Sequence, residues 1–475
     1  MLTTAEIKKF IEADAASAAK KNARVGLRYY EGDHDINQYR IFFFAADGTL
    51  KEDKYKSNIR ISHPFFSLLV DQQVQYMLSG KGGFVRSDTP ELQTELDAYF
   101  NESESFAVEL AELIKGAIIK GSEYMYAYKG EDGKTAFQTA DSLGVVEVRD
   151  KETDDGRAYL IYHFVDRVGK DNKEIKRIQV WDDKQTYFYC QIDDGEIKPD
   201  DSFKPNPRPH ILYQDGKSDD VYYDSYGEIP FFRLDNGKKK TSGVAKIKTL
   251  IDDYDLMNAG LSNNIQDTNE ALYVVRGFHG DNLDEIAVNL RSKKMIGVDE
   301  EGSVEIKTVD IPTEARKVKM EVDEKNIFRF GQGVNTEALK DTSATTSIAI
   351  KSAYANLDLK CDGLMPFVLQ LMRNLLSIVL KEINDAKKTD YRQRDVYFDF
   401  SREIITNAAE NAQIELLDAQ KQQTQITTIL NAAGTIGDEL TAQLICEALD
   451  IDYDDIKDKL PKPGTDPYQD GGEEP

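Results

Sequence analysis

Apolar residues recur at helical spacing over long stretches of the second half of the chain. The pattern predicts a helix over residues 242–270, a charged helix over Glu314–Phe330, and a third helix over Ile348–Ile383. The third helix keeps its apolar positions on one broad face, and at 1.5 Å per residue it spans roughly 50 Å. Three long helices therefore organise this half of the chain.

The last two of these helices are separated by a segment of small and polar residues. Gly331-Gln332-Gly333 is typical of a helix terminator, and the residues that follow it are mostly small and polar up to Ser347. Pro366 cannot donate an N–H to a preceding carbonyl, so a kink is expected near Gly363 and Pro366. We interpret this stretch as a loop held on rigid helical supports.

The first half of the chain mixes helices with strands. One helix is expected over residues 3–30 and another from Phe65 towards Gly80, followed by helices over residues 90–100 and 103–120. After Ser122 the apolar period changes to two, which predicts antiparallel hairpins. The expected strands are Tyr124–Tyr128, Thr135–Thr139, Val145–Arg149, Arg157–Val165, Glu174–Trp181, Thr186–Ile192 and Ile229–Leu234. The fold class is α+β.

Two further segments complete the organisation. The pattern over residues 272–309 predicts a small, compact α/β segment with three strands and a short helix over Leu283–Leu290. Helices are expected over residues 407–434, 437–449 and 453–460. The Pro-, Gly- and acid-rich residues 461–475 are expected to be disordered.

The chain is strongly acidic. It has 85 Asp and Glu against 60 Lys and Arg, which gives a net charge of −25. This charge disfavours stable binding of nucleic acid, but it is compatible with a protein that DNA passes without binding tightly. Polar residues interrupt the apolar run near residues 368–380, so no membrane span is expected. The three cysteines, Cys190, Cys361 and Cys446, are far apart in the sequence. We expect each to be a small buried apolar side chain and not part of a disulfide.

Motifs of catalysis and metal binding are not found in the sequence. The five histidines have no metal-ligand spacing, so we expect no shared histidine site, no metal and no cofactor. There is no phosphate-binding loop of the GxxxxGK[ST] type. The acidic stretch Asp215–Glu228 fails the EF-hand pattern and is interpreted as a solvated loop. Asp252 and Asp253 point about 100° apart on a helix, so they do not face each other as an acid/base pair.

Six short stretches, in this order, resemble one known family. They are Tyr29–Ile36, Phe65–Gly80, Phe328–Gly331, Asp358–Asp362, Phe398–Arg402 and Asn407–Glu410. Together they resemble the portal proteins, or head-to-tail connectors, of tailed bacteriophages, most closely those of siphophages with Gram-positive hosts. None of the stretches is a catalytic motif, so the resemblance implies a protein that is not an enzyme.

The resemblance implies a portal-type subunit with an α/β wing, a two-helix stem, a small α/β clip, a long kinked helix and a helical crown. Carried onto this chain, the parts are the wing 1–241, stem helices 242–270 and 312–331, the clip 271–311, the tunnel loop 332–347, the long helix with its return to the wing 348–400, the crown 401–460 and the tail 461–475.

The resemblance also implies roles for particular residues. The tunnel loop that faces DNA comprises Asn335, Thr336, Glu337, Ala338, Leu339, Lys340, Asp341, Thr342, Ser343, Ala344 and Thr345. The clip, as the docking face for motor and adaptor, includes Arg276, His279, Asp281, Asp284, Glu285, Arg291, Lys293 and Lys294. The hinge and kink positions are Gly331, Gly333, Gly363 and Pro366.

Family members usually form rings of twelve subunits at one capsid vertex. The partners implied for this chain are copies of itself, double-stranded DNA in the channel, the terminase, scaffolding and major capsid proteins, and head-completion or adaptor proteins, but no membrane. The implied location is the virion, with the host cytoplasm during assembly. Two other hypotheses stay open: a capsid adaptor or scaffold module without a channel, and a nucleic-acid-processing enzyme of a mobile element.

Overall fold

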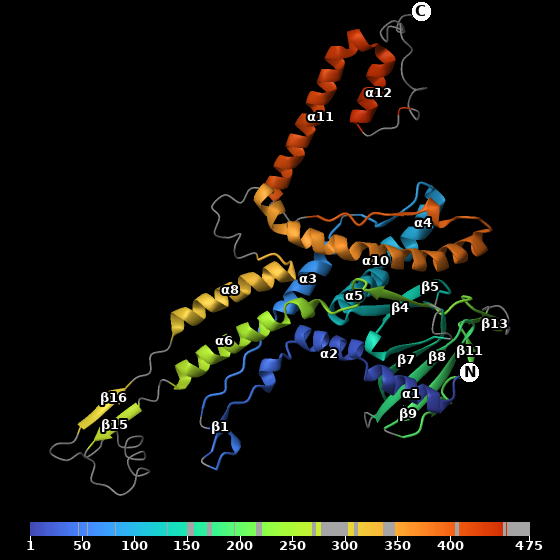
Figure 1. Ribbon diagram of the computed structural model, residues 1–475. Helices are drawn as coiled ribbons and strands as arrows, with labels where there is room; N and C mark the ends of the chain where they lie inside the picture. The colour runs from blue at the N-terminus through green and yellow to red at the C-terminus, as the bar shows by residue number, and fades with distance from the viewer. Residues whose placement is uncertain are drawn as a thin grey trace, which may run out of the picture. The chain divides into compact units, whose positions relative to one another are not determined.

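The computed structural model describes residues 1–45, 47–54, 56–80, 82–130, 132–149, 156–168, 173–193, 195–214, 221–267, 272–276, 303–307, 312–335, 347–403, 408–449 and 453. The chain divides into two compact units. The first comprises residues 1–343 and 352–403, and the second comprises residues 344–351 and 404–475. Helices and strands both contribute substantially to the first unit, which confirms the α+β class (Figure 1).

The N-terminal segment forms two helices where the apolar pattern predicted one. Helix α1 covers Thr4–Ala15 and helix α2 covers Ala18–Tyr30. Ser17 has extended backbone, and its side chain accepts a hydrogen bond from the N–H of Lys20 at 3.2 Å. A serine in this role starts a new helix, because it satisfies a backbone donor that has no partner within the helix. The prediction of a single helix over residues 3–30 is therefore wrong at Ser17.

Helix α3 (Phe65–Met77), helix α4 (Pro90–Leu96) and helix α5 (Glu104–Lys120) follow as the apolar pattern predicted. Before α3, the chain forms a hairpin of β1 (Phe42–Phe44) and β2 (Leu50–Glu52). A π-helical turn, η2 (Asp97–Asn101), extends α4. Helix α5 ends at Gly121, whose φ of +93° suits a residue without a Cβ.

The β-rich region contains two main sheets. The larger has the order β10-β9-β8-β7-β6 with β11 also paired to β9, and the smaller has the order β14-β4-β5. The strands are β4 (Ser122–Lys129), β5 (Thr135–Ala140), β6 (Val145–Arg149), β7 (Arg157–Val168), β8 (Lys173–Trp181), β9 (Gln185–Ile192), β10 (Lys198–Pro199), β11 (Arg208–Pro209) and β14 (Phe231–Asp235). The pairs within both sheets are antiparallel, as the period of two predicted.

Two apolar clusters hold these sheets. Ile7 and Ile11 of α1 pack on one face of the larger sheet, against side chains that include Ile161 and Ile178. The second cluster joins the two sheets through Phe231, which is fully buried beside Trp181. Helix α1, which ends just before Ser17, thus covers one face of the large sheet.

The segment interpreted as a solvated loop is partly a hairpin. Strand β12 (Ile211–Gln214) pairs antiparallel with strand β13 (Val221–Asp224), which lies inside the stretch Asp215–Glu228. The expectation of an irregular loop is wrong at these four residues of β13. Residues 215–220 lie outside the described part of the chain.

A helix pair with a small hairpin follows the sheets. After the short helix η4 (Gly243–Lys246), helix α6 covers Lys248–Asp267 and helix α8 covers Thr313–Gly331. Strands β15 (Leu272–Arg276) and β16 (Ser303–Lys307) pair antiparallel between them in the sequence. Figure 1 shows α6 and α8 side by side, with the hairpin beyond their ends. The helix and strand expected over residues 283–298 lie outside the described residues.

Helix α10 is the longest helix, Ser347–Lys387. It stays continuous through Gly363 and Pro366, so these residues do not interrupt it, and a bend at this place remains a prediction. Among the described residues, one helical stretch, Ser352–Lys387, is long and apolar enough to cross a membrane, judged by length and composition alone. Half of its apolar window is buried inside the protein, and the core helix of a folded protein meets the same criterion.

The chain returns along α10 to strand β17 (Tyr397–Phe398), which pairs with strand β3 (Val85–Arg86). The second unit contains helix α11 (Ala408–Ile436) and helix α12 (Asp438–Ala448). These bounds agree closely with the helices expected over residues 407–434 and 437–449. The tail 461–475 lies outside the described residues.

Candidate functional site

The predicted tunnel loop begins where α8 ends. Gln332 adopts the left-handed conformation with φ 54° and ψ 41°, and the N–H of Gly333 donates to the carbonyl of Phe328 at 3.0 Å. The predicted stop is confirmed, but the left-handed residue is the glutamine and not a glycine. The chain turns out of the helix at this residue.

The flanking glycines serve a different purpose, which is close packing. A Cβ placed on Gly333 would lie 2.1 Å from Cδ2 of Leu69, and one on Gly331 would lie 2.6 Å from Cδ1 of the same leucine. Such distances exclude a side chain unless the neighbours shift. The end of α8 is therefore pressed against α3.

Gln72 of α3 then clamps the next residue. Its carboxamide nitrogen donates to the carbonyl of Val334 at 2.9 Å, and its oxygen accepts from the N–H of Val334 at 3.2 Å. Asn335, the first loop residue, lies near Glu324 of α8, with its Nδ2 3.4 Å from the carboxylate. The loop thus leaves from a point that is fixed on two sides.

Most of the predicted loop and clip residues cannot be placed. Residues Thr336 to Thr345 lie outside the described part, so of the loop set only Asn335 is seen. Of the clip set, Arg276 is the last residue of β15, opposite Ser303 of β16. The other clip residues also lie outside the described part: His279, Asp281, Asp284, Glu285, Arg291, Lys293 and Lys294.

The two hinge positions on α10 differ from those on α8. A Cβ added to Gly363 would meet no atom within 4 Å outside its own helix turn, so the position is sterically open. Pro366 lies inside the continuous helix, three residues further on. Packing explains the glycines at 331 and 333, whereas nothing packed against Gly363 requires a glycine there.

The expected stem helices are joined by charge and by close approach. Lys319 of α8 pairs with Asp253 of α6 and with Asp323 of its own helix, and both carboxylates raise the pKa of the lysine. A Cβ on Gly260 would lie 2.2 Å from Nη1 of Arg316, so the guanidinium of Arg316 on α8 reaches the backbone of α6 at this glycine. Helices α6 and α8 therefore pack directly against each other.

The carboxylates of Asp252 and Asp253 serve different neighbours, as their angle on the helix predicted. Asp252 accepts a hydrogen bond from the hydroxyl of Tyr29 and pairs with Lys248 at 2.7 Å. Burial, followed by the hydrogen bond to Asp252, raises the pKa of Tyr29. Asp253 pairs with Lys319 instead.

The stretch Tyr29–Ile36 attaches the N-terminal helices to α6. His34 and Asp255 are both fully buried and lie 2.6 Å apart, and Asp255 also accepts from Nδ1 of His63 at 2.7 Å. The two histidines thus meet on one carboxylate, a contact that the search for metal-ligand spacing did not predict. Sequence spacing could not show this, since the carboxylate lies about two hundred residues away. Among the described residues, no group of three or more His, Cys, Asp or Glu has the arrangement to hold a metal.

Three of the recognised stretches contact one another. Arg402 donates to Asp358 at 2.9 Å and also pairs with Asp362 of α10. The hydroxyl of Tyr76, from the stretch Phe65–Gly80, donates to Asp358 at 2.8 Å. Segments that are far apart in the sequence therefore converge on one turn of α10.

The cysteine predictions hold for two of the three residues. Cys361 and Cys446 are buried and Cys190 is half-buried, and all three are free thiols. Burial raises the pKa of the Cys361 thiol to about 12, which keeps it protonated and unreactive.

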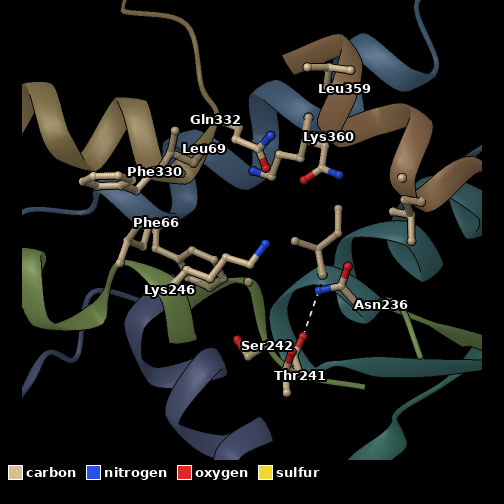
Figure 2. A pocket seen from close by; sticks show the side chains of 18 residues that line it. Phe66, Leu69, Asn236, Thr241, Ser242, Lys246, Phe330, Gln332, Leu359 and Lys360 are labelled. Carbon is tan, nitrogen blue, oxygen red and sulfur yellow. Dashed lines mark hydrogen bonds between the residues drawn. The ribbon is translucent and has the colours of Figure 1, made fainter. Parts of the chain in front are cut away.

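A pocket of about 260 Å³ lies beside the end of α8 (Figure 2). Its walls come from α3, the connection 236–247, the last turn of α8 and the middle of α10. Gln332, the residue at which the predicted loop departs, is one of the lining residues.

Comparisons with known proteins agree with one another. A family model described as "Phage portal protein, SPP1 Gp6-like" matches residues 10–444. A portal protein of Bacillus phage SPP1 is 27% identical over 394 residues, covering 82% of this chain and 75% of the relative. A portal protein of Clostridium phage phiCD119 is 24% identical over 431 residues, covering 86% of this chain and 88% of the relative.

A chain from a solved structure titled "Neck of native GTA particle computed with C12 symmetry" is similar over 81% of this chain and 89% of its own length. The TM-score is 0.39 and the sequence identity is 11%.

Proposed function

This chain belongs to the family of phage portal proteins, SPP1 Gp6-like, and we propose that its copies close into a ring at one vertex of a capsid. In this proposal the ring, of about twelve subunits by analogy with the family, encloses the channel through which double-stranded DNA enters during packaging and leaves during ejection. The family match over residues 10–444 carries the proposal.

The helix pair α6 and α8 supports a ring. Several large apolar side chains on these helices are exposed in the single chain: Leu256, Ile265, Val318, Val322 and Phe330. A ring closes through a heterologous contact, in which one face of each subunit covers a different face of its neighbour. Apolar side chains on a paired stem are suited to such a contact, because burying them removes apolar surface from water.

The division of the subunit follows the same proposal. Residues 1–241 act as the wing, 242–270 and 312–331 as the stem, 271–311 as the clip, and 401–460 as the crown. The clip docks the terminase and later the head-completion or adaptor proteins. The antiparallel hairpin β15–β16, which lies between the two stem helices in the sequence, supports its placement.

The loop from Asn335 to Thr345 is proposed to face the DNA. Its departure point is held by Gln72 and by the contact of Leu69 with Gly333, which fixes the base from which the loop leaves α8. The family is structural, and we propose that the chain itself does not hydrolyse ATP; the pure protein should show no ATPase turnover.

The ring is tested by electron microscopy and mass measurement of the purified chain. The wild type should form closed rings with a central hole. Val318→Asp combined with Val322→Asp places two charges on the exposed face of α8 and should leave subunits that do not assemble. Val108→Asp is the matched control, because Val108 is an exposed valine on α5, outside the stem. Rings that survive the double substitution, or a wild type that stays monomeric at high concentration, would contradict the proposal.

A further inference from the structure

The pocket beside the end of α8 is lined by two lysines on different elements. Lys246 ends the short helix η4 and Lys360 lies on α10. Figure 2 shows both side chains reaching into the pocket from opposite walls. Two ammonium groups that face one cavity create a local positive potential in a chain whose net charge is −25.

Carboxylates of this chain do not neutralise that potential within the described residues. No ion pair joins a described Asp or Glu to Lys246 or Lys360, whereas the partly buried Arg177 and Arg233 of the same unit each have one. Burial, followed by the positive charge of Lys246, lowers the pKa of Lys360 to about 8. An ammonium group that is desolvated and repelled in this way gains free energy from an anionic partner.

Neutral hydrogen-bonding groups line the same cavity. Gln73 of α3 is 2% exposed, and within the described residues its carboxamide oxygen has no hydrogen-bond partner. The hydroxyl oxygen of Ser242 accepts from the N–H of Val244 at 3.3 Å, which leaves the hydroxyl hydrogen available to donate. A buried amide without its full set of partners is costly unless a ligand or water supplies them.

We propose that this pocket binds a small oxyanion of the phosphate class, held between Lys246 and Lys360, with the carboxamide oxygen of Gln73 accepting a hydrogen bond from water bound beside the anion. A volume of about 260 Å³ accommodates such an anion together with water. The two ammonium groups offer positive charge, and together with the hydroxyl of Ser242 they can donate hydrogen bonds to phosphate oxygens. The site does not depend on ring formation or on DNA transport.

A bound anion would connect three elements at the base of the predicted loop. It would link α10 through Lys360 and η4 through Lys246, and α3 through the water that Gln73 holds, next to Gln332 where the chain leaves α8. Occupancy would therefore stiffen the base from which the loop departs.

The test is calorimetric titration of the full chain with sodium phosphate against a chloride-matched blank. The wild type should bind in a saturable manner. At pH 8, binding should take up roughly half a proton, because about half of Lys360 is neutral there and becomes charged when the anion binds. Repeating the titration in two buffers with different heats of ionisation measures this uptake.

Three variants distinguish phosphate binding in the pocket from non-specific binding to positive charge on the surface. Lys246→Met and Lys360→Met should each weaken phosphate binding by about tenfold or more, and Lys360→Met should also abolish the proton uptake. Lys239→Met is the matched control: this exposed lysine lies near the pocket in sequence but does not line it, and its loss should leave the affinity unchanged. Since Lys246 lies at an exposed position, its variant remains informative even if Lys360→Met misfolds.

A second arm identifies the source of the phosphate group. If a short DNA duplex displaces inorganic phosphate from the wild type but fails to bind Lys246→Met, then the site takes a backbone phosphate. If the duplex does not compete, then the site takes the free anion. Either result upholds the oxyanion site. Absence of saturable phosphate binding, or binding unchanged in both lysine variants, would overturn it whether or not the protein forms rings.

Discussion

His34 Nδ1 lies 2.6 Å from Asp255 Oδ2, with both side chains fully buried. The other ring nitrogen of His34 faces the backbone carbonyl of Tyr29 at 3.2 Å, and the ring stacks on that of Tyr29 at 4.5 Å. Both ring nitrogens of His34 therefore lie within hydrogen-bond distance of an oxygen atom, one of a side chain and one of the backbone. The stretch Tyr29–Ile36 is thereby joined to α6 by a buried contact between a histidine and an aspartate.

Asp255→Asn should destabilise the protein by about 3 kcal/mol, because it leaves two histidines facing an amide in place of a carboxylate. Chemical denaturation at one fixed protein concentration measures this. Asp253→Asn is the matched control on the same helix: Asp253 is partly exposed, and its loss should cost about 1 kcal/mol or less. Equal effects of the two substitutions on the free energy of unfolding would show that the burial of Asp255 does not increase its contribution to stability.

Gly333→Ala should destabilise by about 1–3 kcal/mol, because the added Cβ overlaps Leu69. The end of α8 would shift and the clamp on Val334 would loosen, which hydrogen exchange at residues 328–335 would detect as faster exchange. Leu69→Ala in the same chain should relieve the overlap and partly restore the protection.

Gly363→Ala is the contrasting case on α10. No neighbour lies close to the added Cβ, and alanine favours helix over glycine by about 0.5–1 kcal/mol. Thermal unfolding should therefore show equal or higher stability. If the predicted bend near Pro366 depends on Gly363, the variant should assemble but package DNA less efficiently. Normal packaging would show that Gly363 is not a hinge.

Stability should rise with pH between about 8 and 10.5 through Lys360. Its pKa is lowered from 10.5 to about 8 in the folded chain, so the unfolded chain binds more protons in this window. Lys360→Met should remove that rise and, in phosphate-free chloride buffer at pH 7, stabilise the protein by about 1–2 kcal/mol after allowance for partial exposure. A wild type and variant with parallel pH profiles would contradict the assignment.

Arg402→Ala should loosen the segment that leads out of the first unit. It removes hydrogen bonds to Asp358 and Asp362, and charge-assisted bonds of this kind contribute about 1.5–3 kcal/mol each when one partner is lost. Hydrogen exchange at residues 398–403 should accelerate. Arg392→Ala removes an exposed pair with Asp390 and should have little effect.

Lys340→Glu combined with Thr342→Glu, or deletion of residues 338–345, should leave rings intact and impair DNA packaging or retention. The reason is that added negative charge, or a missing loop, changes the contact with phosphate at the channel wall. Packaged DNA per particle is the measurement, and electron microscopy confirms ring formation. Normal packaging by both variants would remove the proposed role of the loop.

Local pattern alone predicted most of the elements. The stops at Gly331-Gln332-Gly333, the strands after Ser122 and the long helices depend on backbone preferences and on a repeating apolar face, both of which act over a few residues. The same pattern missed the break at Ser17, since a capping hydroxyl changes no apolar period. It also gave the wrong reason for Gly331 and Gly333, which are small because Leu69 lies against them.

By itself, therefore, the sequence determined the α+β class, the helix pair with a hairpin between its members, and the resemblance that the family match confirms. Only the tertiary structure decided which distant residues meet: His34 with His63 on Asp255, Arg402 with α10, and Lys246 with Lys360 across one pocket. These contacts join residues that are tens to hundreds of positions apart. The energy of these contacts depends on burial and charge where the residues meet in the folded chain, and the local apolar period of the sequence does not encode either.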